Sequence, residues 1–378
     1  MIKESTVLDD VLKYEQPTKY IVETENYDDS YNTPVLTAGK SFLLGYTNEE
    51  KGVFNEVPVI IFDDFTTSFH FVDFPFKVKS SALKILKAVK DKADIKYLYY
   101  KMQTIKFEAE QHKRYWISKY SQIEIPLPSI ATQQRIAAIL DQSDAIIQNN
   151  RAIVQKYDAL TQSLFLDMFG DPVKNEKGWE KRKLNDFLEV LVDVGSNGGN
   201  DWVSANIKMK DEEDYALMIR TVNLNKNDFE NNLKYVSEET YNLFKKTKVY
   251  GGEIIMNKIG SAGEFWLMPY LNRPVSLGLN QLMMTFKNLD KFYFYFYFST
   301  NYGKKLINSK LNGATTKSIT KTALRDLDIL YPPMELQNQF AERVAVIEAQ
   351  KQQAQLELAK SEELFQSLLQ RAFKGELN

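Results

Sequence analysis

Two long segments of the chain, residues 131–169 and 335–373, repeat apolar positions at steps of alternately four and three residues. Neither segment contains proline or glycine, whereas proline precedes each one and glycine follows it, at Gly170 and Gly375. Proline before a helix and glycine after it are common boundaries, and this spacing over about five heptads indicates a coiled-coil seam. We therefore predict two helices, each roughly 60 Å long at 1.5 Å per residue, that pack on each other.

The predicted seam is mostly apolar, but Asn150 and Lys351 occupy inward positions near the middle of the two helices. We expect these polar residues to interrupt the packing there. The apolar members of the predicted seam are Ile136, Leu140, Ile147, Val154 and Leu164 in the first helix, and Phe340, Val344, Ile347, Leu358, Phe365 and Leu368 in the second.

The two helical segments are copies of each other. A shift of 204 positions places Gln133 on Gln337, Pro128 on Pro332, and "QSLFLDMF" (162–169) on "QSLLQRAF" (366–373) without a gap. An ungapped match over about 45 residues is the signature of an internal repeat. Two unrelated surface helices would not match in this way.

The regions in front of the helices share a plan rather than a sequence. Each contains a short amphipathic stretch, a β-rich middle, an aromatic helix-like stretch and a basic polar loop. The paired stretches are "VLDDVLKY" and "KLNDFLEV", "VPVIIFDDF" and "GEIIMNKIG", "IKYLYYKM" and "DKFYFYFYF", and "EQHKRYWISK" and "NGATTKSITK".

This pattern predicts an α+β fold with two mixed α/β globular domains in pseudo-repeat, each followed by a long helix. We expect the two helices to form an antiparallel coiled coil. The predicted division is a first globular domain at 1–130, a first helix at 131–170, a turn-rich linker at 171–182, a second globular domain at 183–334 and a second helix at 335–378.

Composition limits the chemistry that is available. The absence of cysteine excludes disulfides, thiolate metal sites and a cysteine nucleophile, and it fits a reducing compartment. The chain has no apolar leader and no membrane-length apolar run, so we expect a cytoplasmic protein without a membrane partner.

Catalytic motifs are also missing. His70 and His112 lack metal-ligand spacing, and the glycine-rich "VGSNGGND" lacks the Lys-Ser/Thr of a phosphate-binding loop. Asp63 and Asp64 could hold a metal, but a solvated turn is the simpler interpretation because no third ligand is evident. We therefore expect no catalytic residue, no metal site and no cofactor in this chain.

Charge is unevenly distributed. The net charge is −2, yet between Glu264 and Asp326 nine basic residues face a single acid, Asp290. Such a local excess is what a phosphate-binding surface requires, although a solvated basic face would look the same.

Side chains that can read base edges or bind phosphates are concentrated in a few polar loops. For each of them an ordinary solvated turn is the alternative interpretation. The candidate DNA-binding residues are Lys40, Ser41, Lys113, Arg114, Tyr115 and Lys119 in the first half, and Asn197, Asn200, Lys258, Ser261, Thr315, Thr316, Lys317, Ser318 and Lys321 in the second.

Over essentially its whole length the chain resembles the specificity subunit of type I restriction-modification systems. The resemblance rests on "IPLP" followed by Gln133 and Gln134, on the helix ending "QSLFLDMFG", and on the second helix ending "QSLLQRAFKGEL". The two globular domains match this family only in plan.

The resemblance implies two target recognition domains, each reading one half of a bipartite site in double-stranded DNA. It also implies that the two helices set the spacing and dock two methyltransferase subunits, with restriction/translocase subunits beyond them. S-adenosylmethionine and ATP would then belong to those partner subunits. Two alternatives stay open: a DNA-recognition subunit of a related bifunctional methyltransferase-endonuclease, and a coiled-coil scaffold without a DNA partner.

Overall fold

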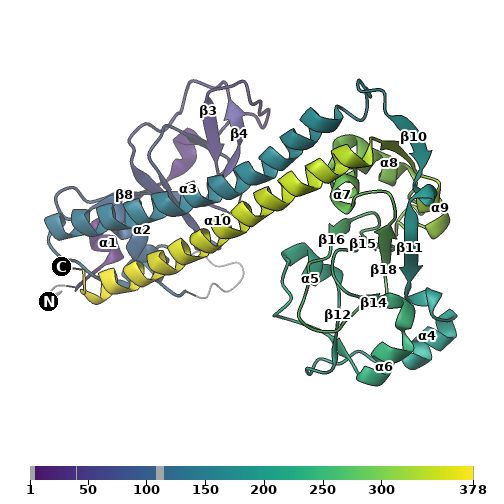
Figure 1. Ribbon diagram of the computed structural model, residues 1–378. Coiled ribbons are helices and arrows are strands. Elements are labelled where there is room, and N and C mark those ends of the chain that lie inside the picture. The colour runs from purple at the N-terminus through teal and green to yellow at the C-terminus, as the bar shows by residue number, and fades with distance from the viewer. Residues whose placement is uncertain (1–4, 40, 108–114, 378) are drawn as a thin grey trace. The chain divides into compact units, whose positions relative to one another are not determined.

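The computed structural model describes residues 5–39, 41–107 and 115–377. Both predicted helices are present as single elements, α3 (Ile130–Phe169) and α10 (Met334–Lys374) (Figure 1). Residue contacts divide the chain into two compact units. Unit 1 comprises residues 1–153 and 354–378, and unit 2 comprises residues 154–353. Each unit therefore contains one globular region and one half of each long helix.

The halves of α3 and α10 pack against each other within each unit. In unit 1, Asn150 donates to Ser361 at 3.3 Å and Arg151 pairs with Glu362 at 2.6 Å. In unit 2, Lys351 pairs with Asp158 at 2.6 Å, and Phe340 packs against Phe165 with ring centroids 5.7 Å apart. In these two contacts of unit 2 the residue number rises along α3 as it falls along α10, so the prediction of an antiparallel coiled coil is confirmed. Both polar seam residues find polar partners, because serine and aspartate face them across the seam.

The predicted seam residues fall into two groups by burial. Those nearest the globular regions are buried, and those nearer the middle of the helices or on the flank of the seam are partly exposed. The buried group is Ile136, Leu140, Ile147, Phe340, Val344 and Phe365, and the half-buried group is Val154, Leu164, Ile347, Leu358 and Leu368.

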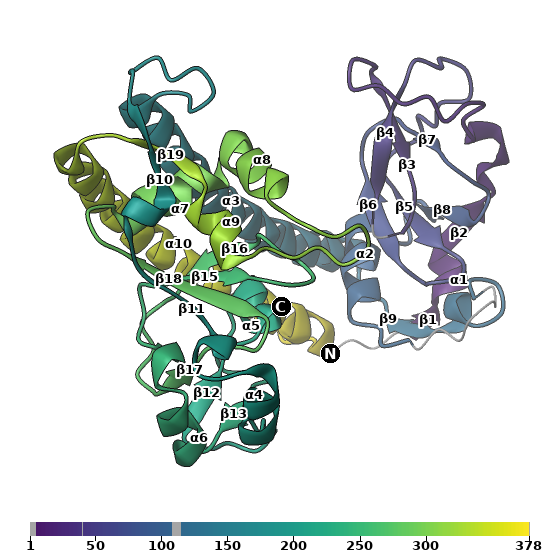
Figure 2. The ribbon, with the colours of Figure 1, turned by 90° about the vertical axis from the view of Figure 1, so that its right-hand side faces the viewer.

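Unit 1 contains two small sheets and a strand pair. Its four-stranded antiparallel sheet has the order β2-β8-β5-β6, and a three-stranded sheet has the order β4-β3-β7 (Figure 2). The bounds are β1 (Ser5–Val7), α1 (Leu8–Val11), β2 (Leu12–Glu15), β3 (Thr33–Leu36), β4 (Leu43–Thr47), β5 (Val59–Asp63), β6 (Phe69–Val72), β7 (Lys77–Val78), β8 (Leu83–Ala88), α2 (Ile95–Gln103) and β9 (Glu124–Pro126), which pairs with β1.

Unit 2 repeats this topology with additions. Its four-stranded sheet has the order β11-β18-β15-β16, its second sheet has the order β13-β12-β17-β14, and β10 pairs with β19. The strands are β10 (Glu180–Lys183), β11 (Leu188–Asp193), β12 (Ala216–Met218), β13 (Tyr235–Val236), β14 (Lys248–Val249), β15 (Ile254–Asn257), β16 (Phe265–Leu267), β17 (Val275–Ser276), β18 (Gln281–Phe286) and β19 (Asp328–Tyr331). The helices are α4 (Asn200–Asn206), α5 (Thr221–Lys226), α6 (Glu238–Leu243), α7 (Lys291–Ser299), α8 (Asn301–Ser309) and α9 (Lys321–Arg325).

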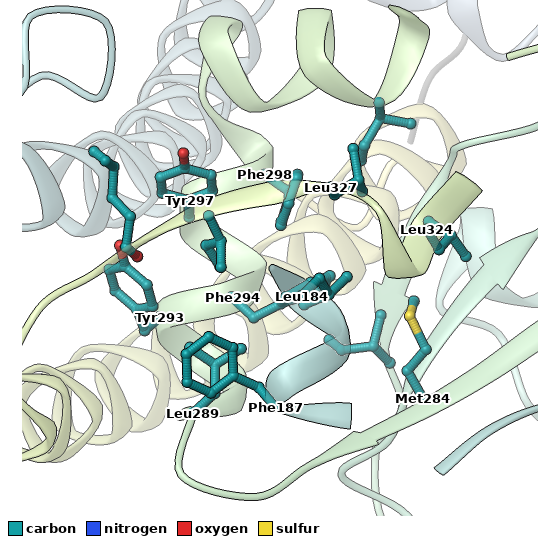
Figure 3. Close-up of a cluster of buried hydrophobic side chains, with 14 of the residues drawn as sticks. Leu184, Phe187, Met284, Leu289, Tyr293, Phe294, Tyr297, Phe298, Leu324 and Leu327 are labelled. Atoms are coloured by element: carbon teal, nitrogen blue, oxygen red, sulfur yellow. The ribbon is translucent and has the colours of Figure 1, made fainter. Parts of the chain in front are cut away.

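An aromatic helix anchors the long helices in each unit. In unit 2, Tyr293 of α7 packs against Phe169 at the end of α3, with ring centroids 4.8 Å apart, inside a cluster of buried side chains (Figure 3). In unit 1, Tyr97 of α2 packs against Phe373 near the end of α10 at 5.4 Å. Each helix begins in one unit and ends in the other. The repeated sequences "QSLFLDMF" and "QSLLQRAF" at the two helix ends therefore pack into equivalent aromatic cores, one in each unit.

A repeated glutamine fixes the start of each long helix. Gln133 is fully buried; it donates to the Pro128 carbonyl at 2.8 Å and accepts from the Asp94 backbone N–H at 2.8 Å. Gln337 makes the same two contacts, with the Pro332 carbonyl at 2.8 Å and the Asp290 N–H at 2.9 Å. Each glutamine thus joins the proline turn to the N-terminus of the aromatic helix.

No helix within residues 5–39, 41–107 and 115–377 is both long enough and apolar enough to cross a membrane.

Candidate nucleic-acid interface

One end of the four-stranded sheet in unit 2 collects most of the predicted DNA-binding residues of the second half. The strands β11, β18 and β15 are antiparallel neighbours, and Asp193 pairs with Leu282 while Asn257 pairs with Gln281. The end of β11, the start of β18 and the end of β15 therefore meet at the same sheet edge. The loops that leave this edge carry Ser196, Lys258 and Ser261. We call this edge and its loops the loop edge of unit 2.

The pre-helix loop, residues 312–320, docks onto the loop edge through its backbone. The Ile319 N–H donates to the Lys258 carbonyl at 2.9 Å, and the Gly260 N–H donates to the Lys317 carbonyl at 3.1 Å. The structure thereby brings together Lys258, Ser261, Lys317 and Ser318, which lie far apart in the sequence.

The tip of this loop is a tight turn. Gly313 has a φ of +98°, and a Cβ added there would lie 2.3 Å from the Thr316 carbonyl oxygen. Thr315 and Thr316 are exposed on this turn. They are therefore accessible to a ligand, and their side chains have the donors and acceptors that base edges require.

Asp193 is the electrostatic centre of the loop edge. Its carboxylate lies 2.6 Å from the Lys258 Nζ and 3.0 Å from the Lys321 Nζ, and it accepts a hydrogen bond from the Ser196 hydroxyl at 2.9 Å. Burial opposes ionisation of Asp193, but the hydrogen bonds from the two lysines and the serine outweigh it and lower its pKa to about 2. The carboxylate is therefore charged at neutral pH and holds two lysines, one in the loop after β15 and one at the start of α9.

A groove of about 540 Å³ opens beside the loop edge. Its lining contains three kinds of side chain that bind nucleic acids. Lys304 and Lys317 can bind phosphates, and Asn225 and Asn308 can hydrogen-bond to base edges. The rings of Trp266 and Tyr295 can stack on bases. Its complete lining is Asn225, Gly260, Ser261, Ala262, Gly263, Glu264, Phe265, Trp266, Tyr295, Ser299, Lys304, Ile307, Asn308, Leu311 and Lys317. Neither groove lysine forms an ion pair with another described residue.

Two predicted residues of unit 2 differ from the rest. Asn197 uses its amide inside the protein: its Nδ2 donates to the Thr247 hydroxyl at 3.1 Å and its Oδ1 accepts from the Lys246 N–H at 3.0 Å. The structure therefore gives this side chain a structural task that leaves it no free edge for a base. Asn200 is exposed at the start of α4.

The predicted residues of unit 1 are less completely placed. Lys40, Lys113 and Arg114 lie outside the described residues. Ser41 is exposed in a turn, and Lys119 is exposed in a turn immediately before the short 3₁₀ helix Tyr120–Gln122.

Tyr115 lies in the core rather than on the loop surface. It is 1% exposed, and its ring packs 5.1 Å from that of Phe107. Its backbone N–H donates to the Asp64 carbonyl at 2.9 Å, which draws this part of the loop into the domain. A base or phosphate cannot reach the ring in this conformation, which corrects the sequence-based expectation.

Asp64 also differs from the solvated turn that its sequence context predicts. It is 3% exposed, lies 3.4 Å from the buried Lys84 Nζ and accepts a hydrogen bond from the Trp116 N–H at 2.8 Å. Asp63 does form the turn, because its carboxylate accepts the Phe65 N–H at 2.8 Å. The described residues contain no cluster of three His, Cys, Asp or Glu that could hold a metal ion.

Sequence reasoning named Ser261 and Lys317 of the groove lining but missed Asp193 and the other groove residues. Asp193 ends the apolar run "LEVLV", and an acid at the end of a strand was the available signal, but its two lysines come 65 and 128 positions later. The groove is assembled from α5, β16, α7, α8, the loop between β15 and β16 and the loop that follows α8, which no local pattern reveals.

Two copies of one α/β unit, each packed on halves of the same two long helices, are the architecture of a protein with two recognition modules, and unit 2 carries basic and amide-bearing loops at its loop edge. The family model described as "Type I restriction modification DNA specificity domain" matches residues 3–156 and 176–358. The chain belongs to this type I restriction-modification DNA specificity family.

Individual relatives agree with the family. The chain is 33% identical over 350 residues to the specificity subunit of the Escherichia coli type I restriction enzyme EcoR124I/EcoR124II, covering 89% of this chain and 84% of the relative. Its fold is similar to the crystal structure of a type I restriction-modification S subunit from M. genitalium, with a TM-score of 0.61, 14% identity and coverage of 98% and 96%. A chain from a structure on complex assembly and conformational transition of the type I R-M system matches with a TM-score of 0.51 and 14% identity, with coverage of 99% and 98%.

Proposed function

We propose that this chain is the DNA sequence-specificity subunit of a type I restriction-modification complex, and that each unit reads one half of a bipartite target in double-stranded DNA. The observation that carries the proposal is the repetition of one architecture. Both units have a four-stranded sheet with equivalent strand order and the same buried glutamine at the helix start. In both, a later backbone N–H, of Tyr115 or Ile319, donates to the carbonyl of the residue that follows the third strand, Asp64 or Lys258. A duplicated recognition module on one scaffold is what a two-part target requires.

The paired helices supply the spacing between the half-sites. Two half-site contacts on one chain act together through a high effective concentration, provided that their separation matches the DNA. A coiled coil keeps that separation constant, because its length is set by the number of residues in each helix.

The outer faces of the helices offer docking surfaces for the methyltransferase subunits, of which we propose two. Ile146 and Ile153 of α3 are 49% and 42% exposed, and Leu160, seven positions further, is 50% exposed. The heptad spacing of these three exposed apolar side chains places them on one face of α3, which fits a partner helix. On α10, Val346 and Leu356 are also exposed, at 63% and 55%. Restriction/translocase subunits would join through these partners.

We assign no catalytic step to this chain. Methyl transfer with S-adenosylmethionine and ATP-driven cleavage would take place on the partner subunits, and this chain would direct them to the target. A related arrangement, in which the chain serves a bifunctional methyltransferase-endonuclease, is distinguished by which subunit co-purifies with it.

Salt dependence of DNA binding tests the proposal against a scaffold without a DNA partner. Each phosphate contact adds about 0.9 to the slope of log affinity against log salt concentration. We expect a slope that Lys304→Gln and Lys317→Gln together reduce by about two, with Lys90→Gln, an exposed lysine of unit 1, as the matched control. Binding that does not respond to salt, or that Lys90→Gln weakens equally, would contradict the proposal.

A further inference from the structure

The Asp193 carboxylate joins three segments at the loop edge of unit 2. Asp193 ends β11, Lys258 follows β15, and Lys321 begins α9. The side chain of Asp193 is 8% exposed, whereas those of Lys258 and Lys321 are 31% and 33% exposed. The acid is therefore inside the protein, and part of each lysine is available to solvent.

The charges of this cluster do not cancel. One carboxylate faces two ammonium groups, so the cluster keeps a net charge of +1. An unrestrained lysine is a flexible point charge that binds any phosphate within reach. Lys258 and Lys321 instead have fixed positions, because a largely buried acid that is ionised at neutral pH holds both Nζ atoms within 3.0 Å.

The pre-helix loop depends on the same cluster. Lys258 holds this loop through its carbonyl, which accepts from the Ile319 N–H at 2.9 Å, and Lys321 lies two residues beyond Ile319. Holding both lysines in place therefore also positions the backbone contact between Lys258 and Ile319. This contact fixes the pre-helix loop, which contains the exposed threonines and Lys317.

Unit 1 has a carboxylate at the equivalent junction. There the Tyr115 N–H donates to the Asp64 carbonyl at 2.9 Å, which corresponds to the contact between Ile319 and Lys258. The Asp64 carboxylate accepts from the Trp116 N–H and pairs with a buried lysine. The two units place the acid on different strands, because Asp193 ends β11 whereas Asp64 follows β5. In each unit the acid pairs with a lysine close to this backbone contact.

An acid beside a phosphate-binding surface weakens general attraction to DNA, so its presence needs a compensating benefit. Phosphate contacts position a protein on the duplex, and base contacts then provide specificity. A lysine held in one position binds a phosphate in one placement of the duplex, whereas a flexible lysine can bind phosphates in many placements and does not discriminate among them.

We propose that Asp193 is a positioning residue that determines specificity: it fixes Lys258, Lys321 and the pre-helix loop in the geometry that reads one half-site, and it limits non-specific phosphate binding by unit 2. This inference rests on the proposed function of unit 2 in reading DNA. Asp193 would thus contribute to the discrimination of one half of the target without contacting a base itself.

The test compares Asp193→Asn with wild type in the full-length chain assembled with its methyltransferase subunits. Affinity is measured by fluorescence anisotropy at several salt concentrations. The probes are an unmethylated duplex that carries the sequence methylated by the assembled complex, and two duplexes in which one or the other half-site is scrambled. We expect about a tenfold loss of discrimination at one half-site only, the size of one good base contact. Affinity for a fully scrambled duplex should rise, with a salt slope steeper by about one.

Asp326→Asn is the matched control, because Asp326 also pairs with two lysines, Lys183 at 3.0 Å and Lys310 at 2.7 Å, but on an exposed side chain. It carries the same change in net charge and should leave discrimination at both half-sites unchanged. Asp193→Glu, which restores the charge, should recover part of the discrimination. Thermal unfolding of each variant separates these effects from a loss of folding, which would lower affinity for every duplex.

Three outcomes would overturn the inference. They are unchanged discrimination in Asp193→Asn, equal loss at both half-sites, and equal loss in Asp326→Asn. If the wild-type protein itself did not distinguish target from scrambled DNA, the proposed function would fail instead of this inference.

Discussion

Lengthening both long helices by one heptad should lengthen the gap between the two half-sites of the DNA target. The unit boundaries fall between Ile153 and Val154 in α3 and between Gln353 and Ala354 in α10. Seven residues inserted at both points add about 10 Å to each helix at 1.5 Å per residue. The internal contacts of each unit are untouched, and the heptad preserves the seam. About 10 Å is the rise of three base pairs of duplex DNA, so we expect the gap to grow by up to about three base pairs.

The assay is sequencing of modified bases in DNA exposed to the variant assembled with its methyltransferase subunits. The half-site sequences should stay the same, because the reading loops of both units are unchanged. A matched control places seven glycine and serine residues after Gly178, which is exposed and has no atom within 4 Å of an added Cβ. It lengthens the chain equally but not the helices, and it should leave the gap unchanged. An unchanged gap in the heptad variant, or altered half-site sequences, would refute the role of the helices as the spacer.

Three further predictions concern the buried polar groups. Gln337→Ala leaves the Asp290 N–H and the Pro332 carbonyl without their partner, so the free energy of unfolding, measured by urea titration, should fall by about 1–3 kcal/mol. The control Gln339→Ala, on the exposed face of the same helix, should change it by less than about 0.5 kcal/mol. Lys84→Met leaves a carboxylate buried and unpaired and should cost about 3–5 kcal/mol, against little effect for the exposed Lys90→Met by the same measurement. Because the pKa of Asp193 is lowered to about 2, its contribution to stability is complete above pH ~4 and is lost as the pH falls through ~2. Acid unfolding of Asp193→Asn should accordingly be less steep between these pH values than that of wild type.

The long helices could be predicted because their information is local. A heptad pattern bounded by proline and glycine specifies a helix and its apolar face over consecutive residues, and the structure has both helices. The repeat of Gln133 and Gln337 was also visible. Its role was not, because the contact that explains it reaches a backbone N–H 39 and 47 positions earlier in the chain.

The sheets and the site depend on contacts that no short stretch of sequence contains. The strands are two to six residues long, and pairs such as β2 with β8 and β11 with β18 join distant parts of the chain. The basic loops could be identified by composition. Which of their residues are accessible could not, because the burial of Tyr115 and the task of Asn197 depend on distant partners such as Asp64 and Thr247.

The grouping of the helix halves likewise follows from pairing rather than from chain order. An antiparallel coiled coil returns the end of each helix to the start of the other, so Phe373 completes the core of unit 1 and Phe169 that of unit 2. Sequence order suggests successive domains and helices, whereas contacts combine each globular region with halves of both helices.

Sequencing the modified bases in DNA exposed to this chain and its methyltransferase subunits shows directly whether the two units read two half-sites at a fixed distance. We expect one motif made of two short defined half-sites, separated by a gap of constant length and unspecified sequence. Replacement of residues 183–330 by the corresponding region of another family member should change one half-site and leave the other half-site and the gap as they were. A continuous motif, a gap of variable length, or a swap that changes both half-sites would show that the two units do not read separate half-sites across a fixed spacer.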